Sequence, residues 1–432
     1  MLFSSCAVVK TPYFQASYYK NTVNRLEDEK DSIKYSSDSL YAGFSKVSIT
    51  PDVSMNVPLA GYGQSKTRYA TGVHDSVFVR AAALKSGGLL SVIVSADMLL
   101  MPPDVIDTVI ARVKLKGIGR NQLFFSATHT HSSIGGWGYG ILSKLIAGKQ
   151  NPHIKEWLAE KIITSVMTAS SGLQQAYIST GSFSAPEFTL NRLTHIADQL
   201  NTDFDYMIIT LKDGSRGVIG SYSAHATTIG SSNTLVSGDY PGSWERNLEN
   251  SGYDLAMFCG GSMANQSPYG KGKVFESAEF IGRSLADSLL KNSASDVPTG
   301  NPEQSSFSLK LDLPAYHMRM SKNCNFPTWL SRKMMAEPEN VMLQALKINN
   351  LIWFFTPGDF SGEAALLLKK ILKGKGLDTV VSGYNGSYIG YILPGKYFWL
   401  KHYETRKMSW YGPGLGDYMM DIMERMSNLF TH

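Results

Sequence analysis

A strand, a helix and a second strand follow one another in residues 88–131, and this order limits how the chain can fold. Residues 88–97 and 121–131 are apolar runs typical of buried strands. Between them, residues 103–117 repeat apolar side chains with the period of an α-helix. Such a unit makes its two strands parallel neighbours in a sheet that helices cover. The sequence therefore predicts an α/β fold.

Antiparallel strands are expected beside this parallel pair. Residues 205–227 form two alternating runs around Asp213-Gly214, which predicts a β-hairpin. Residues 275–292 have the pattern of an amphipathic helix. We therefore expect one large catalytic domain at residues 41–432, with mixed, partly parallel sheets flanked by helices. The linker-like residues 292–306 are a possible internal boundary.

The first 40 residues differ in character from the rest of the chain. They are polar and charged, and Val23, Leu26 and Ile33 repeat with helical spacing. We interpret residues 1–40 as a polar helical tether in front of the catalytic domain. The extreme N-terminus lacks the basic segment and the apolar stretch of a signal peptide, so we expect no signal peptide there.

Charge and cysteine content exclude several classes of protein. The chain carries 41 basic and 36 acidic residues, a formal charge of +5 that is spread without long blocks. We therefore expect no nucleic-acid partner. Cys6, Cys259 and Cys324 are too few and too far apart for a cysteine zinc site or a disulfide framework. No apolar stretch is long enough to span a bilayer.

Two histidines stand one residue apart at the end of the predicted strand 121–131. They are His129 and His131, in the stretch ATHTHSS. Alternate side chains of a strand point the same way, so both imidazoles can face one pocket. One could then bind a metal while the other carries a proton. The alternative is a pair of hydrogen-bonded polar residues that close an ordinary strand.

A third histidine and three carboxylates occupy comparable positions. His225 ends the second strand of the predicted hairpin. The carboxylate candidates are Asp97, Asp239 and Asp359. Catalytic zinc usually takes three protein ligands and leaves one position open, so this pattern favours a metal site at strand ends. Asp97 could orient a histidine, or it could cap the helix that begins near Pro103. No nucleophile-elbow, phosphate-loop or dinucleotide-binding motif is present.

Several short motifs, in order, resemble those of the neutral (alkaline, non-lysosomal) ceramidases. Residues 127–136, ATHTHSSIGG, resemble the ATHTHSGPGG motif of that family. The other matching segments, in chain order, are GFSKVSITPDVSMNVPLAGYG, LNRL, SAHATTIGSSNTLVSGDYPG, NQSP, TPGDF and YIGYILPGKYFWLKHYE. The resemblance covers residues 41–430.

The resemblance implies a zinc site and a set of catalytic residues. The residues that match the zinc ligands of the family are His129, His225, Asp359 and Tyr391. Those that match its catalytic groups are His131, Arg192, Tyr403 and Ser267. His131 would take a proton from water and pass it to the leaving amine, while Arg192 and Tyr403 would stabilise the oxyanion. Asp359 stands where the family has glutamate, and aspartate is also a good oxygen ligand.

The resemblance also implies a function and a compartment. We expect a zinc-dependent amide hydrolase that cleaves ceramide or a related lipid amide into a fatty acid and a sphingoid base. The alternatives are a zinc hydrolase for a non-lipid amide or ester, and a catalytically silent binding protein of the cell envelope. A location in the cell envelope, in the periplasm or outside the cell follows from the resemblance alone.

A strongly apolar segment follows the two neighbouring histidines. Residues 137–149 carry Trp137, Ile141 and Leu142, together with two lysines. We expect this segment to line an acyl-chain groove or to touch a membrane surface. The alternative is an amphipathic helix that packs on the sheet.

Overall fold

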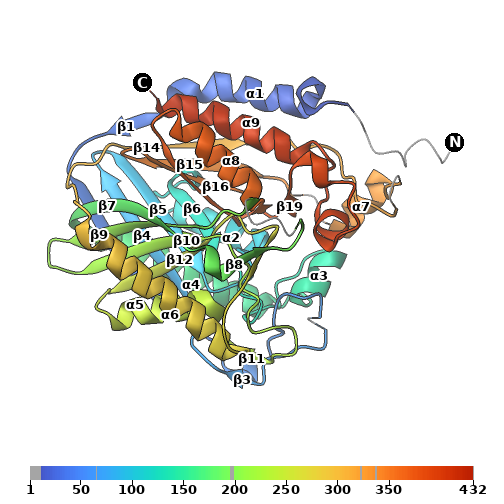
Figure 1. The fold of residues 1–432 in the computed structure, drawn as a ribbon, viewed down its shortest axis with the longest axis horizontal. Helices are drawn as coiled ribbons and strands as arrows, with labels where there is room; N and C mark the ends of the chain where they lie inside the picture. Colours follow the sequence, from blue (N-terminus) through green and yellow to red (C-terminus); the bar gives the residue numbers. More distant parts are fainter. Residues whose placement is uncertain (1–10, 65, 195–198, 322–323, 336–337, 432) are drawn as a thin grey trace.

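Two β-sheets lie face to face between two layers of helices (Figure 1). The computed structural model describes residues 11–64, 66–194, 199–321, 324–335 and 338–431. Cys6 and the first ten residues of the predicted tether lie outside these ranges. Within the described ranges, no helix has the length and apolar character needed to cross a membrane.

The larger sheet has eight strands and mixes both pairing modes. β5 and β6 are parallel, as are β10 and β12, and the other pairs are antiparallel. In spatial order the strands are β12 (Leu255–Gly260), β10 (Arg216–Tyr222), β9 (Asp203–Leu211), β7 (Gln174–Ser184), β2 (Leu40–Ser48), β4 (Phe78–Ser86), β5 (Leu89–Ala96) and β6 (Leu123–Ala127). Helix α2 (Pro103–Lys114) joins one parallel pair and α5 (Asp239–Asn250) joins the other.

The smaller sheet has five strands and one parallel pair. In spatial order they are β1 (Lys34–Ser36), β14 (Gln304–Lys310), β15 (Met342–Ile348), β16 (Leu351–Phe355) and β18 (Asp378–Ser382). β16 and β18 are parallel, and α8 (Gly362–Lys373) lies between them in the chain. The expected mixed, partly parallel sheets flanked by helices are thus confirmed.

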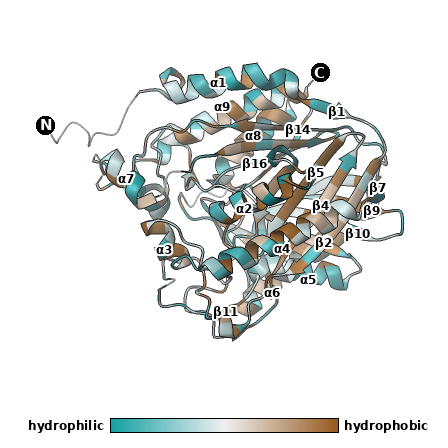
Figure 2. Ribbon diagram, turned by 180° about the vertical axis from the view of Figure 1, so that it is seen from behind, coloured by the Kyte–Doolittle hydropathy of each residue, from teal (hydrophilic) through white to brown (hydrophobic). Residues whose placement is uncertain are grey.

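Apolar side chains on alternate faces of the strands hold the layers together. Ile93 and Phe124 of the larger sheet share a buried cluster with Trp353 and Phe355 of the smaller one. The outer face of the larger sheet is covered by α2 and α4 (Pro152–Ser171) at one end and by α5 and α6 (Phe275–Asn292) at the other. Helices α1 (Ser17–Glu29), α8 and α9 (Leu415–Ser427) cover the smaller sheet. Figure 2 shows the apolar strands β4 and β5 behind α4.

The elements expected at residues 88–131 are present, with different ends. The helix ends at Lys114, and Gly117 follows with a φ of +87°. The second strand ends at Ala127, two residues before the first histidine. The expectation that His129 and His131 lie in a strand is therefore wrong. The chain leaves the sheet there because His129 has a left-handed backbone, with a φ of +62°.

Helix α1 lies on the outer helical layer, beside α9. Its Tyr19 and Leu26 belong to the same apolar cluster as the buried residues of α9. The Thr22 and Tyr418 hydroxyls are 2.8 Å apart and share a hydrogen bond. The division at residue 40 and the boundary at residues 292–306 stay predictions.

A buried arginine binds three carboxylates on the outer face of the larger sheet. Arg80 of β4 is 2% exposed, and its Nη1 lies 2.9 Å from Asp97 and 2.8 Å from Glu245 of α5. Glu249 of α5 lies 3.6 Å from Arg80 Nε. Asp97 also accepts the backbone N–H of Phe78. It therefore neither orients a histidine nor caps α2, and both expected roles of Asp97 are wrong.

Replacing Arg80 with methionine is expected to lower the free energy of unfolding by about 3–5 kcal/mol, because buried carboxylates lose their cation. Arg112 is the matched control, since its contacts with Glu156 and Glu160 are at the surface. Arg112→Met should cost less than about 1 kcal/mol. Urea unfolding measures both values, and equal losses would contradict the role of the Arg80 cluster.

Candidate functional site

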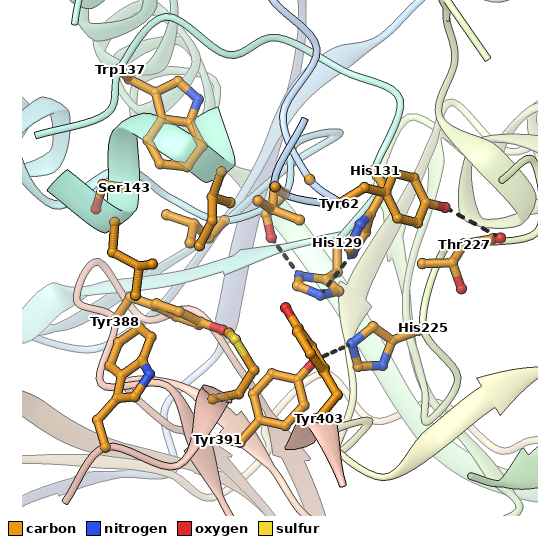
Figure 3. Close-up of a pocket in the computed structure, with 18 of the residues that line it drawn as sticks. Tyr62, His129, His131, Trp137, Ser143, His225, Thr227, Tyr388, Tyr391 and Tyr403 are labelled. Atoms are coloured by element: carbon orange, nitrogen blue, oxygen red, sulfur yellow. Dashed lines mark hydrogen bonds between the residues drawn. The ribbon is translucent and has the colours of Figure 1, made fainter. Parts of the chain in front are cut away.

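A cavity of about 460 Å³ opens where both sheets end, and it has a polar and an apolar part (Figure 3). The polar part contains residues from the segments after β6, β8 (Thr189–Asn191) and β10, from β19 (Tyr391–Ile392), and from the start of the π-helix Glu404–Met408. These are His129, His131, Arg192, His225, Tyr391 and Tyr403. The apolar part is made by Leu99, Leu100, Trp137, Leu142, Ile146, Met335, Met408 and Trp410.

Two histidines are oriented by backbone carbonyl groups. Nδ1 of His129 lies 2.6 Å from the carbonyl oxygen of Leu99, and Nδ1 of His225 lies 2.8 Å from that of Met263. A carbonyl oxygen can only accept, so each Nδ1 carries the proton and each Nε2 keeps a lone pair. Metal-binding histidines are usually oriented by such a contact on their other nitrogen.

Asp359 lies against these histidines, fully buried in β17 (Asp359–Phe360). Its Oδ1 is 3.7 Å from His129 Nε2 and 4.0 Å from His225 Nε2. The Tyr384 hydroxyl donates to Oδ1, and the Tyr388 hydroxyl donates to Oδ2 from 2.6 Å. The Tyr384 ring also stacks on His129, with centroids 4.6 Å apart and planes at 8°. Tyr384 thus positions both residues.

Tyr391 links His225 to a buried arginine. β17 and β19 are parallel, and their pairing places Tyr391 directly beside Asp359. The Tyr391 hydroxyl lies 2.8 Å from His225 Nε2 and accepts a hydrogen bond from Arg192 Nη2 at 2.9 Å. Arg192 Nε also pairs with Glu404 at 3.0 Å. The guanidinium is therefore held at the cavity wall from two sides.

His131 lies beside His129, with ring centroids 4.9 Å apart. Their Nε2 atoms are 3.3 Å apart. The ring of Tyr62 packs against the His131 ring with centroids 4.6 Å apart, and the Arg68 guanidinium donates to the His131 carbonyl oxygen. A Cβ atom at Gly61 would lie 2.5 Å from His131 Nδ1, so only glycine leaves room for this imidazole.

The three imidazoles form a buried cluster that could bind a metal. Ligand atoms of His129, His131 and His225 all lie within 4.8 Å of one another. Burial lowers the pKa of His129, and it lowers the pKa values of His131 and His225 well below the usual range. Neutral imidazoles offer lone pairs without first losing a proton. With the nearby carboxylate and phenol, these nitrogens make a donor set that fits a divalent cation.

Besides Asp359 and Asp97, two further sequence-derived candidates lie outside the cavity lining. Ser267 is on β13 (Gln266–Pro268), where it pairs with Leu190. The carbonyl oxygen of its neighbour Gln266 accepts from His225 Nδ1 at 3.2 Å. Asp239 begins α5 and accepts the backbone N–H groups of Ile229 and Tyr240.

Several residues of the site had not been singled out from the sequence. They are Gly61, Tyr62, Tyr384, Tyr388 and Glu404. Tyr384 and Tyr388 lie in a segment between β18 and β19 with no helical or strand periodicity. The only available indication was the density of tyrosines in YNGSYIGYIL.

Known proteins share this fold and part of this sequence. Residues 41–261 match the sequence profile of the family described as "Neutral/alkaline non-lysosomal ceramidase, N-terminal". The neutral ceramidase of Pseudomonas aeruginosa is 26% identical over 247 residues, which are 52% of this chain and 36% of that protein. The neutral ceramidase of Drosophila melanogaster is 24% identical over 308 residues, which are 57% of this chain and 43% of that protein. The matches thus span less than half of either relative.

Two solved structures have the same fold. The crystal structure of the Pseudomonas aeruginosa neutral ceramidase superposes with a TM-score of 0.75 at 19% identity, covering 89% of this chain and 73% of that one. A structure described as a ceramidase complexed with C2 superposes with the same TM-score and identity, covering 90% of this chain and 76% of that one.

Gly61→Ala is expected to displace His131 and to destabilise the protein. Its new Cβ meets the imidazole, and the backbone there has a φ of +97°. The matched control is Gly63→Ala, where φ is +67° and no atom lies within 4 Å of the new Cβ. Backbone strain alone should cost about 1–2 kcal/mol in Gly63→Ala.

Overpacking should add a further 1–3 kcal/mol, roughly, in Gly61→Ala. Urea unfolding gives both free energies, and the imidazole NMR signals of His131 should shift only in Gly61→Ala. If the two variants lose the same stability and leave those signals in place, Gly61 is not what seats His131.

Proposed function

The chain belongs to the neutral/alkaline non-lysosomal ceramidase family, and from this premise we propose that it is a zinc-dependent amide hydrolase. It would cleave the N-acyl bond of ceramide or a related lipid amide, releasing a fatty acid and a sphingoid base. The observation that carries this proposal is one cavity lined by imidazole and phenol groups and by an apolar wall, with the buried Asp359 carboxylate against the imidazoles.

The proposed zinc ligands are Nε2 of His129, Nε2 of His225, the carboxylate of Asp359 and the hydroxyl of Tyr391. Both Nε2 atoms lie within 4.0 Å of the carboxylate, and Asp359 and Tyr391 are adjacent across one strand pair. When bound, zinc supplies Lewis-acid chemistry, which polarises a carbonyl oxygen and makes water more acidic. Tyr384 and Tyr388 would keep the carboxylate in place.

His131 is the proposed proton carrier. It faces the same space as His129, and its ring is fixed between Gly61 and Tyr62. A neutral imidazole in this position can take a proton from the attacking water. It can then deliver that proton to the amine nitrogen as the amide C–N bond breaks.

Arg192 and Tyr403 are the proposed donors to the developing oxyanion. Arg192 is held by Tyr391 and Glu404, so its charge is preorganised at the cavity wall. Tyr403 lines the cavity and is 58% exposed, so its hydroxyl can reach a bound substrate. Ser267 would contribute through its neighbour Gln266, whose carbonyl oxygen holds His225.

The apolar wall supports a lipid substrate. Leu142 and Ile146 of α3 (Ile141–Ala147) and Met335 of α7 (Thr328–Met335) line it together with two tryptophans. The volume falls within the range of sites that enclose small ligands. An acyl chain would bury its methylene groups here, with its carbonyl carbon beside the imidazoles.

The purified protein is expected to carry close to one zinc ion per chain. His129→Ala and His225→Ala should each lose the metal, because each removes a ligand that the buried site cannot replace. Metal content by mass spectrometry, with circular dichroism to verify folding, measures this. Folded variants that keep full zinc occupancy would refute the ligand assignment.

His131→Ala is the matched control, since it removes a third imidazole of the same cluster. It should keep the zinc while turnover falls by roughly 10²–10⁴-fold, as for loss of a general acid–base group. Loss of zinc in this variant would instead identify His131 as a ligand.

Leu142→Ser is expected to raise KM for long-chain N-acyl substrates more than for short-chain ones. The Leu142 side chain lines the cavity, and each methylene that it helps to bury is worth about 0.8 kcal/mol. Ile141 is the control, because it is 52% exposed and outside the cavity lining. With detergent-dispersed substrates, Ile141→Ser should leave the chain-length dependence unchanged.

The KM values are measured by fatty-acid release from a series of N-acyl sphingosines, with short peptides as non-lipid competitors. Equal effects of Leu142→Ser on all chain lengths would show that the acyl chain does not bind in this part of the cavity. Preference for the peptides would identify a non-lipid hydrolase.

A further inference from the structure

Two short helices at the cavity have apolar side chains on their outer surface. Helices α3 and α7 contact each other, and both contribute to the cavity wall. Figures 1 and 2 place them together at one end of the molecule. Their exposed residues include Ile141 at 52%, Leu145 at 36% and Trp329 at 68% of full exposure. We call these three residues the α3/α7 surface.

The charged side chains on the two helices themselves are all basic, whereas Asp104, Asp107 and Glu339 line a neighbouring cavity with Ser143 and Met335. Lys144 lies on α3, and Arg332 and Lys333 lie on α7. Neither helix contains an aspartate or a glutamate. Lys149, just after α3, is also exposed. Basic side chains next to an exposed tryptophan and aliphatic residues are typical of segments that lie at a membrane interface.

We propose that the α3/α7 surface docks the protein onto an anionic lipid bilayer. Trp329, Ile141 and Leu145 would enter the headgroup region, and the lysines and arginine would contact lipid phosphates. This proposal adds a membrane-docking surface to the proposed function and rests on that function for the identity of the substrate. The same two helices face the bilayer on one side and the cavity on the other. A lipid amide could therefore pass from the bilayer into the cavity without crossing bulk water.

The continuity between surface and cavity distinguishes this face from other exposed apolar residues. Val297 is 88% exposed, but it lies on a segment beside β7, and no lysine or arginine lies within four residues of it in sequence. Ile141, in contrast, is adjacent in sequence to the cavity residue Leu142. Docking through α3 and α7 would thus bring the cavity to the membrane.

Binding of the full chain to large vesicles tests the proposal. Vesicles of phosphatidylcholine alone are compared with vesicles containing 30% phosphatidylglycerol, in roughly 0.1 M salt, where charges within about 10 Å still interact. The wild-type protein should bind the anionic vesicles at least tenfold more tightly. Ile141→Ser with Trp329→Ser should weaken binding to both vesicles by roughly tenfold or more, because apolar side chains no longer insert.

Separate variants test the contribution of the basic residues and the importance of their position. Lys144→Gln with Lys333→Gln should weaken binding to anionic vesicles by roughly 25-fold, since each basic residue contributes about fivefold, and should leave the neutral vesicles unaffected. Val297→Ser and Lys212→Gln, far from α3 and α7, should change nothing. Thermal unfolding verifies that every variant is folded. Equal binding of all folded variants would overturn the proposal.

Two further outcomes separate docking from catalysis. If the wild type hydrolyses dispersed lipid amides but does not bind anionic vesicles, docking fails and the proposed function stands. If it binds the vesicles as expected but hydrolyses no lipid amide, either dispersed or in vesicles, the proposed function is wrong and the docking proposal is supported. A dimer in solution that Trp329→Ser dissociates would show that this surface binds a second copy of the chain, which also overturns docking.

Discussion

The carboxylate of Asp359 has no contact with solvent, and its position decides how the rest of the site is built. A buried carboxylate is costly unless donors or a cation satisfy it. Tyr384 and Tyr388 supply one hydrogen bond to each oxygen. Oδ1 also lies 3.7 Å from Nε2 of His129 and 4.0 Å from Nε2 of His225, and neither nitrogen can donate. A cation among these three acceptors would satisfy all of them at once.

The two sheets bring these groups together from distant parts of the chain. His129 and His225 follow strands of the larger sheet, whereas Asp359 and Tyr391 belong to the segments that follow β16 and β18 of the smaller one. Direct contacts connect the two sets, since Ser126 of β6 donates to the Gly383 carbonyl and Asn385 accepts the backbone N–H of Phe125. These hydrogen bonds, together with the apolar layer between the sheets, fix the distance between the histidines and the carboxylate.

Part of the fold could be predicted from the sequence because it depends on the periodicity of apolar residues. The parallel pair around residues 88–131 and the hairpin at residues 205–227 follow from apolar patterns, and the structure confirms both. His129 and His131 were expected to face one pocket, and both line the same cavity. They do not reach the cavity as alternate residues of a strand, however, because the strand ends at Ala127 and the left-handed backbone of His129 turns the chain. Local conformation of this kind has no periodic pattern in sequence.

Other parts of the site could not be derived from pattern. Arg192 follows a three-residue strand and Tyr403 begins a single π-helical turn, and only resemblance to a family indicated them. Tyr384 has a left-handed backbone, with a φ of +71°, so no helix or strand pattern could place its ring on His129. Asp97 follows a strand as the expected ligands do, yet it binds Arg80 because that arginine is buried on the adjacent strand.

Fatty-acid release from a ceramide by metal-stripped and reloaded protein tests the central claim most directly. The stripped protein should stay folded and lose its activity, and one equivalent of zinc per chain should restore it. Reloaded His225→Ala should stay inactive in the same assay. A stripped protein that hydrolyses ceramide at the original rate would contradict a zinc site built from His129, His225, Asp359 and Tyr391.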